Sequence, residues 1–201
     1  MERIRQVFTR IGNRYMERKI KQHGMKYTAS VGDAAVDAVT HFLETYWPQT
    51  VAVHNVEHET DFQQFDVDLL WTVANKHGRL RTIPIEVKGD RYHRTGNFFF
   101  ETVSNASKGT PGCFLYTGAT WLFYYFVEID HLYCLPMNVI RPWFHEQMEQ
   151  FPERETSTPV GSEHYITIGR LVPIDRVLEE VEGVQQYRRQ QDEWLLLTGI
   201  G

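Results

Sequence analysis

The strongest constraint on the fold is a pair of strand-like segments separated by a short polar turn. Residues 65–73 and 80–88 are rich in Leu, Val, Ile and Trp, and residues 75–79 (Asn-Lys-His-Gly-Arg) are typical of a turn. We therefore expect a β-hairpin centred on His77, in which residues equally distant from His77 lie opposite each other. Because Pro84 has no N–H to donate, its nitrogen should face an unpaired side or a bulge.

This register gathers charged side chains on one face of the hairpin. Asp68 would lie opposite Glu86 and Asp66 opposite Lys88, with opposed Cβ atoms about 5 Å apart. Residues two apart on a strand share a face, so the four side chains would form one patch. A slip of one residue would send one pair to the other face.

Such a patch has the chemistry of a metal site. Three carboxylates among apolar neighbours repel one another unless a cation neutralises them. Oxygen ligands without His or Cys favour Mg²⁺ or Mn²⁺ over Zn²⁺. Lys88 beside the metal would orient an attacking water or stabilise charge on a phosphoryl oxygen, as phosphodiester hydrolysis requires.

The order of these features is similar to that of a known superfamily. A helix, a strand, Asp68 before Leu69-Leu70-Trp71, a turn and then Ile85-Glu86-Val87-Lys88 resemble the PD-(D/E)xK nucleases. The resemblance covers about residues 30–104, and it extends more loosely to about residue 136, where the aromatic segments resemble phage-type members. It implies a restriction-endonuclease-like α-β-β-β-α-β core.

The resemblance also implies a role for each charged residue. Asp68 and Glu86 would be metal ligands and Lys88 the catalytic lysine, while Asp66 is the rival for the first ligand. Many members add a Glu from the preceding helix. The helix here offers Asp33 or Asp37 instead, and Glu101 on a later strand is a substitute.

The net charge of −5 argues against a nucleic-acid partner, but the charge is unevenly distributed. Residues 1–26 hold eight Lys/Arg against Glu2 and Glu17, a net charge of +6, so residues 27–201 carry −11. Local basic patches decide polyanion binding. We expect a phosphate-facing rim to be formed by Arg91, His93, Arg94 and Lys108.

The remaining pattern indicates an α/β fold, bordering on α+β, with a mixed sheet flanked by helices. Residues 2–22 predict a basic amphipathic helix, and a second helix should begin at Ser30 and end before Pro48. Further strands are expected at residues 50–56, 97–103, 121–127, 131–135 and 164–172, and further helices at 138–150 and 173–181. The tail after Gly183 is ambiguous.

This pattern divides the chain into three parts. Residues 1–26 form a basic N-terminal helix, residues 27–150 a nuclease core, and residues 151–201 a polar linker, a strand and a helix packed on that core. We expect the N-terminal helix to contact a DNA duplex or to serve as a dimer arm in a homodimer.

These observations predict a Mg²⁺-dependent (or Mn²⁺-dependent) endonuclease, a hydrolase that cleaves double-stranded or branched DNA. Three alternatives remain open: a Holliday-junction resolvase, a nuclease-fold protein that binds DNA without cutting, and an interaction protein whose acidic patch is only solvated. No apolar run is long enough to span a bilayer, and two distant cysteines fit a reducing compartment, so we expect a cytoplasmic protein with no membrane contact.

Overall fold

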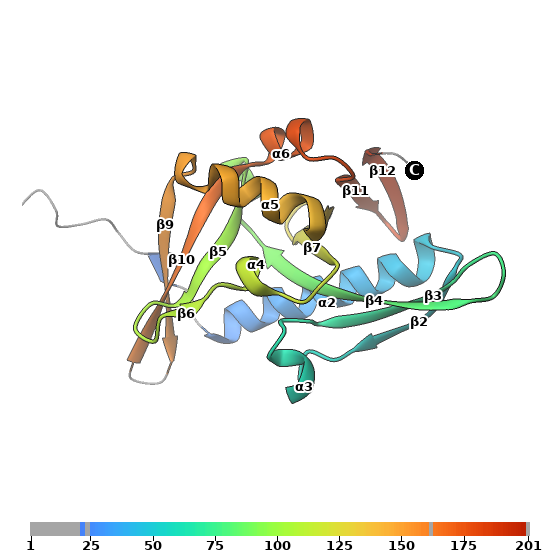
Figure 1. The fold of residues 1–201 in the computed structure, drawn as a ribbon, viewed down its shortest axis with the longest axis horizontal. Helices are drawn as coiled ribbons and strands as arrows, with labels where there is room; N and C mark the ends of the chain where they lie inside the picture. Colours follow the sequence, from blue (N-terminus) through green and yellow to red (C-terminus); the bar gives the residue numbers. More distant parts are fainter. Residues whose placement is uncertain (1–20, 23–24, 161–162, 200–201) are drawn as a thin grey trace, which may run out of the picture.

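Two mixed β-sheets and the helices that cover them form the fold (Figure 1), which a computed structural model describes for residues 21–22, 25–160 and 163–199. The larger sheet has seven strands in the order β12 (Glu193–Thr198), β11 (Gln185–Gln190), β8 (His131–Pro136), β7 (Trp121–Phe126), β4 (Leu80–Asp90), β3 (Leu69–Ala74) and β2 (Thr50–Asn55). The smaller sheet has the order β1 (Lys21–Gln22), β9 (Glu153–Val160), β10 (Glu163–Pro173), β5 (Asn97–Asn105) and β6 (Thr110–Pro111).

Five α-helices are described. The longest lies behind the larger sheet in Figure 1, and two shorter ones lie in front of it. The helices are α2 (Met25–Tyr46), α3 (Thr60–Gln63), α4 (Cys113–Tyr116), α5 (Met137–Gln147) and α6 (Ile174–Glu180), with 3₁₀ turns η1 (His93–Thr95) and η2 (Met148–Gln150). The predicted α/β class with a mixed sheet is confirmed. Within the described ranges, no helix is long and apolar enough to cross a membrane.

The predicted hairpin and its register are confirmed. In the antiparallel β3–β4 pair, Leu69 lies opposite Ile85 and Ala74 opposite Leu80. The Pro84 carbonyl accepts a hydrogen bond from Thr120 N at 2.8 Å, so the Pro84 nitrogen also faces the β7 side. The parallel β4–β7 ladder begins only at Ile85, and the missing N–H therefore costs no ladder bond.

Helix α2 covers one face of the larger sheet because the apolar side chains of β3 and β4 alternate with polar ones. Phe42 and Leu43 pack in one buried cluster with Leu69 and Ile85. A Cβ atom on Gly89 would lie 2.5 Å from the Val31 carbonyl oxygen, so this glycine permits the close approach of α2 to β4.

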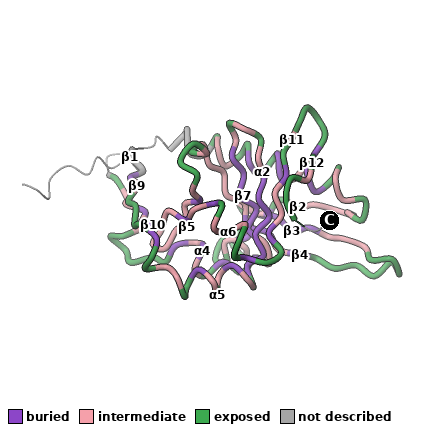
Figure 2. Tube along the Cα trace, turned by 90° about the horizontal axis from the view of Figure 1, so that it is seen from above, coloured by how far each residue is buried: buried purple, intermediate pink, exposed green. Residues whose placement is uncertain are grey.

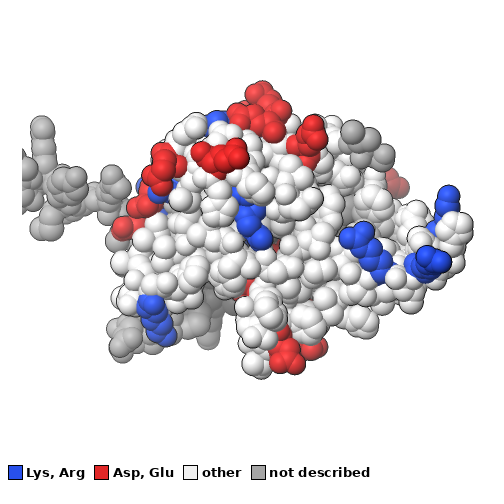
Figure 3. Space-filling model, viewed as in Figure 1, with Lys and Arg blue, Asp and Glu red and all other residues white. Residues whose placement is uncertain are grey.

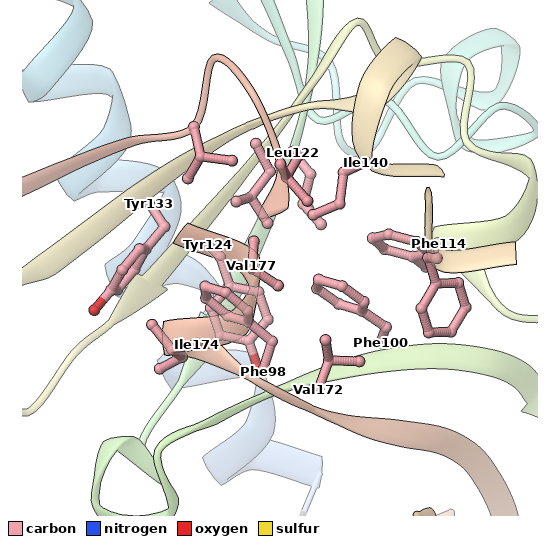
Figure 4. Packing of buried hydrophobic residues seen from close by; sticks show 14 of the residues in the cluster. Phe98, Phe100, Phe114, Leu122, Tyr124, Tyr133, Ile140, Val172, Ile174 and Val177 are labelled. Atoms are coloured by element: carbon pink, nitrogen blue, oxygen red, sulfur yellow. The ribbon is translucent and has the colours of Figure 1, made fainter. Parts of the chain in front are cut away.

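The opposite face of the larger sheet packs against the smaller one. Figure 4 shows Phe98 and Phe100 of β5 pointing toward Leu122 and Tyr124 of β7. Figure 2 shows the buried segments concentrated around α2 and around β7 of the larger sheet. In the parallel β4–β7 ladder, Glu86 is the partner of Leu122 and Lys88 is the partner of Tyr124. Paired residues of neighbouring strands point to the same face of the sheet. The sequence-predicted charged residues of β4 therefore face the space between the two sheets.

Several expected elements differ from the structure. Helix α2 begins at Met25 rather than Ser30, since a capping preference of about 1 kcal/mol does not outweigh good helix formers such as Met25 and Lys26 upstream. Most of the expected N-terminal helix lies outside the described residues. Its last two residues form strand β1, which pairs with β9.

The C-terminal region is more regular than expected. The predicted linker, residues 151–163, contains β9, and the ambiguous tail forms the β11–β12 hairpin. The polar residues of β9 are compatible with a strand that has one solvent-exposed face, since Ser157 is buried whereas residues 153–155 are exposed. Strand β10 pairs with β5, and β11 pairs with β8, so this region adds strands to both sheets.

Candidate active site

The β3–β4 register places Asp68 beside Glu86, as the sequence predicted. Asp68 lies just before β3, where its N–H donates to the Ile85 carbonyl at 2.9 Å. Its carboxylate Oδ2 accepts a hydrogen bond from Val87 N at 2.8 Å, which ties the side chain to the backbone of β4. The carboxyl group of Asp68 is thereby fixed at the base of the hairpin, and a side-chain hydrogen bond joins it to Glu86.

Glu86 is the most unusual side chain of the group. It is 8% exposed, and among the residues that the structure describes its Oε2 atom has no hydrogen-bond partner. A buried polar atom without a partner costs free energy, and such atoms are rare in folded proteins. The position of Glu86 at the centre of the sheet therefore points to a role other than stability.

Lys88 lies two residues further along β4 and pairs with a residue of the other sheet. Its Nζ atom forms an ion pair with the Glu101 carboxylate on β5, and both side chains are largely buried. Strand β5 is itself anchored nearby, since Phe99 N donates to the Tyr124 hydroxyl at 3.1 Å and that hydroxyl bonds to Asp90. Glu101 thus joins the group as the partner of Lys88.

Asp66 lies in a loop rather than on β3, where the sequence predicted it. Its φ of 45° lies in the left-handed region, so the extended conformation of β3 begins only after Asp66. The Thr117 hydroxyl donates to the Asp66 carbonyl at 2.6 Å and holds this turn. Asp66 remains close enough to interact electrostatically with Lys88 and Glu101, so it borders the site without being part of the ladder.

Helix α4 contributes two residues that sequence reasoning missed. Cys113 lies near enough to Glu101, Glu86 and Lys88 for their charges to act on its thiol, and Tyr116 forms a side-chain hydrogen bond with Asp66. Both follow Gly112, where a Cβ atom would lie 2.3 Å from the carbonyl carbon and oxygen of Glu101. No local pattern marks these residues, because the chain returns to the site only through the pairing of β5 with β6.

The pKa shifts in the site reflect a buried cluster in which, among the described residues, carboxyl groups outnumber the one cation, Lys88. Burial raises the pKa of Asp68 to about 6, and burial followed by the charges of Asp68 and Asp66 raises that of Glu86 well above its usual range. Burial also raises the pKa of Asp66. For Lys88, burial lowers the pKa but the charge of Glu101 outweighs it, so the net pKa is raised and the ammonium form persists.

The helix carboxylates are not brought to this site. Asp33 and Asp37 lie on the exposed side of α2, and α2 covers the opposite face of the sheet from Glu86. The expectation that Asp37 could join the metal ligands is therefore wrong, because the sheet separates the two. Within the described part of the chain, no three His, Cys, Asp or Glu side chains form a ready-made metal site.

The four residues expected to line a phosphate-facing rim do not form one patch. Arg91 and His93 face Glu128, at 3.1 Å from Arg91 Nη2 and 3.7 Å from His93 Nδ1, and Arg94 lines a hollow beside them. Lys108 is exposed at the far end of β5, about 30 Å along the strand from Arg94. The site lies between these two positions.

Comparison of the chain with protein-family models, with curated proteins and with solved structures gives no match in any of the three. The chemistry of the site therefore rests on its own residues.

Proposed function

We propose that this protein is a Mg²⁺-dependent or Mn²⁺-dependent endonuclease that hydrolyses DNA phosphodiester bonds. The observation that carries the proposal is the convergence of Asp68, Glu86 and Lys88 on one sheet face, with Glu86 Oε2 buried and unpartnered among the described residues. A protein that only binds a partner has no need of carboxylates held together at this cost.

The order of elements supports the same proposal. Helix α2 is followed by the antiparallel strands β2, β3 and β4, with the short helix α3 between β2 and β3. Strands β5 and β6 of the smaller sheet then intervene before α4 and β7, and β7 runs parallel to β4. Apart from α3, β5 and β6, this order is compatible with the α-β-β-β-α-β core implied by the resemblance to PD-(D/E)xK nucleases. We therefore include a restriction-endonuclease-like core in the proposal.

The residues fit a hard divalent cation. Asp68, just before β3, and Glu86 on β4 offer carboxylate oxygens side by side, and burial together with neighbouring carboxylates raises the pKa of each. A bound divalent cation would offset the negative charge that burial disfavours. Asp68 and Glu86 would hold the metal, with Asp66 at the edge as a further oxygen ligand. A bound Mg²⁺ would lower the pKa of a coordinated water and offset the charge of the phosphate.

The charge of Lys88 defines its part in the reaction. Because its pKa is raised, Lys88 keeps its proton and cannot serve as the base that deprotonates water. Its ammonium group can donate a hydrogen bond to the attacking water or to a phosphoryl oxygen as negative charge develops there. Glu101 fixes the direction of the Lys88 side chain, which makes Glu101 a positioning residue.

Cleavage assays test the proposal directly. Plasmid, linear duplex and four-way-junction DNA are incubated with wild-type protein and Mg²⁺ or Mn²⁺, with EDTA as the metal-free control. We expect metal-dependent cleavage that Glu86→Gln and Lys88→Ala abolish and that Asp33→Asn, on the exposed side of α2, retains. Cleavage of the junction alone would narrow the activity to a resolvase. Cleavage of no DNA by the wild type would overturn the proposal.

A further inference from the structure

The outer end of the β3–β4 hairpin extends beyond the rest of the larger sheet (Figures 1 and 2). Strand β2 pairs with β3 only up to Val73, and β7 pairs with β4 only from Ile85 onward. The segment 75–82 is exposed throughout, and Leu80 is 64% exposed. The tip therefore adds little to the core and is free to contact another molecule.

This segment, which we call the basic arm, carries positive charge without compensation. It holds Lys76, Arg79 and Arg81, and residues 74–85 contain no Asp or Glu. None of the ion pairs formed within the described ranges involves these three side chains. Figure 3 shows basic side chains at the projecting end of the molecule, where Figure 1 places the hairpin. Clustered like charges of this kind are typical of a surface that meets a polyanion.

The arm and the candidate active site belong to the same two strands. Arg81 precedes Glu86 by five residues and Arg79 precedes it by seven, which corresponds to about 17 and 24 Å along a strand. Successive base pairs of B-DNA rise about 3.4 Å, so these distances correspond to about five to seven base pairs.

The odd spacing puts Arg81 on the face of β4 that carries Ile83 and Ile85, opposite to Glu86. The arm can therefore meet a duplex bound at the site only where the hairpin projects beyond the sheet and is exposed throughout. A duplex that runs from the site past the projecting end of the hairpin would present one backbone phosphate to the site and others to the arm, whose long Lys and Arg side chains extend from that end.

We propose that the basic arm grips the DNA backbone about five to seven base pairs from the phosphate that is cleaved. This inference rests on the proposed nuclease function. The contacts are with phosphates, so the arm supplies affinity and register and does not read base sequence. Lys76, Arg79 and Arg81 are binding residues in this proposal and take no part in the chemistry.

Fluorescence anisotropy without added metal tests the arm separately from cleavage. The Lys76→Ala/Arg79→Ala/Arg81→Ala variant should bind a duplex of more than two helical turns less tightly than wild type. Its log–log salt slope should be shallower by about 2.7, since each lost phosphate contact removes about 0.9.

Two matched variants control for charge and folding. The charge-conserving variant Lys76→Arg/Arg79→Lys/Arg81→Lys should keep the wild-type slope. Arg154→Ala/Arg188→Ala removes exposed basic residues of β9 and β11 and should also leave the slope unchanged. An unchanged salt slope in the arm variant would overturn only the proposal that the basic arm binds DNA. Failure of the wild type to bind any duplex would overturn the nuclease proposal as well. If the arm variant loses binding only to anionic lipid vesicles, the surface faces a membrane and the proposal is wrong.

Discussion

The ammonium group of Lys88 on β4 pairs with the carboxylate of Glu101 on β5, so one ion pair bridges the two sheets at the candidate active site. The Lys88 and Glu101 side chains are 28% and 16% exposed, which leaves little solvent to replace either partner. If one partner is removed, the charge of the other stays buried, and no opposite charge offsets the free-energy cost of its desolvation. The pair therefore links the stability of the inter-sheet contact to the geometry of the site.

Removing one partner of this pair should cost more than removing both. We expect Lys88→Met and Glu101→Leu each to lower the free energy of unfolding by about 2 kcal/mol, because the remaining charge is unpaired. The double variant should lose clearly less than the sum. Urea denaturation of the four proteins measures the coupling, and Asp192→Ala, which breaks the Arg189–Asp192 pair at the side chain of Asp192, 91% exposed, serves as control and should cost less. Additive losses at the first pair would contradict this account.

The raised pKa of Asp68 predicts a pH-dependent stability. The folded state holds this proton more tightly than the unfolded chain, whose Asp has a pKa of 3.8. The group therefore contributes most below about pH 4, and its contribution is lost as the pH rises through about 6. The loss is about 3 kcal/mol by linkage. Asp68→Asn keeps an acceptor for Val87 N and should become more stable than wild type above pH 6.

Denaturation curves between pH 4 and pH 8 check this prediction. The difference in unfolding free energy between Asp68→Asn and wild type should grow between about pH 4 and pH 6 and level off above that range. Asp33→Asn, exposed on α2, should show no such trend. A constant difference across the range would mean that Asp68 is not desolvated as the structure indicates.

Metal should compete with protons for the same carboxylates. We expect Mg²⁺ or Mn²⁺ to raise the melting temperature of wild type at pH 8, because a ligand that binds only the folded state stabilises it. The shift should shrink as the pH falls below about 6, where Asp68 becomes protonated. Thermal melts with and without metal measure both effects. An equal shift in the Asp68→Asn/Glu86→Gln double variant would exclude a metal site here.

The parts of the fold that the sequence predicts well are those set by local pattern. The β3–β4 register follows from apolar alternation on both sides of one turn, so the pairing of Asp68 with Glu86 can be computed from residue numbers. Strand β9 was missed because its polar residues lack apolar alternation. Its strand structure depends on pairing with β10, which no short window of sequence contains.

The same distinction applies to the site. Asp68, Glu86 and Lys88 lie on neighbouring strands of one hairpin and were predicted together. The role of Glu101 as the partner of Lys88, and the presence of Tyr116, depend on how β5 and α4 fold back over the sheet. Asp37 was placed wrongly because helical spacing shows which residues lie on the same face of a helix. It does not show on which side of the sheet that helix packs.

Gly112 should be essential for bringing α4 to the site. Gly112→Ala places a Cβ atom 2.3 Å from the Glu101 backbone, where neither chain can move freely, and should lower both stability and cleavage. Gly32→Ala is the matched control, since a Cβ there meets nothing within 4 Å. In the interior of α2 that change should stabilise the protein by about 0.5–1 kcal/mol. Thermal melts and cleavage assays on both variants test this, and a harmless Gly112→Ala would contradict the described packing.

The two candidate first ligands, Asp66 and Asp68, should differ sharply on substitution. Asp68 is fixed to the β4 backbone beside Glu86, whereas Asp66 lies in a left-handed turn and bonds to Tyr116. Asp68→Asn should therefore abolish cleavage, and Asp66→Asn should reduce it less.

Tyr116→Phe decides what Asp66 contributes. It removes the hydroxyl that bonds to Asp66 and leaves every carboxylate in place. If Asp66 acts at the edge of the metal site, Tyr116→Phe should change the Mg²⁺ concentration needed for half-maximal cleavage by a few-fold and leave the maximal rate nearly constant. Metal titrations of the cleavage rate for wild type, Asp66→Asn and Tyr116→Phe measure this. An inactive Asp66→Asn beside an active Asp68→Asn would reverse the assignment, because the ligand would then be the residue in the turn and Asp68 would only anchor β3 to β4.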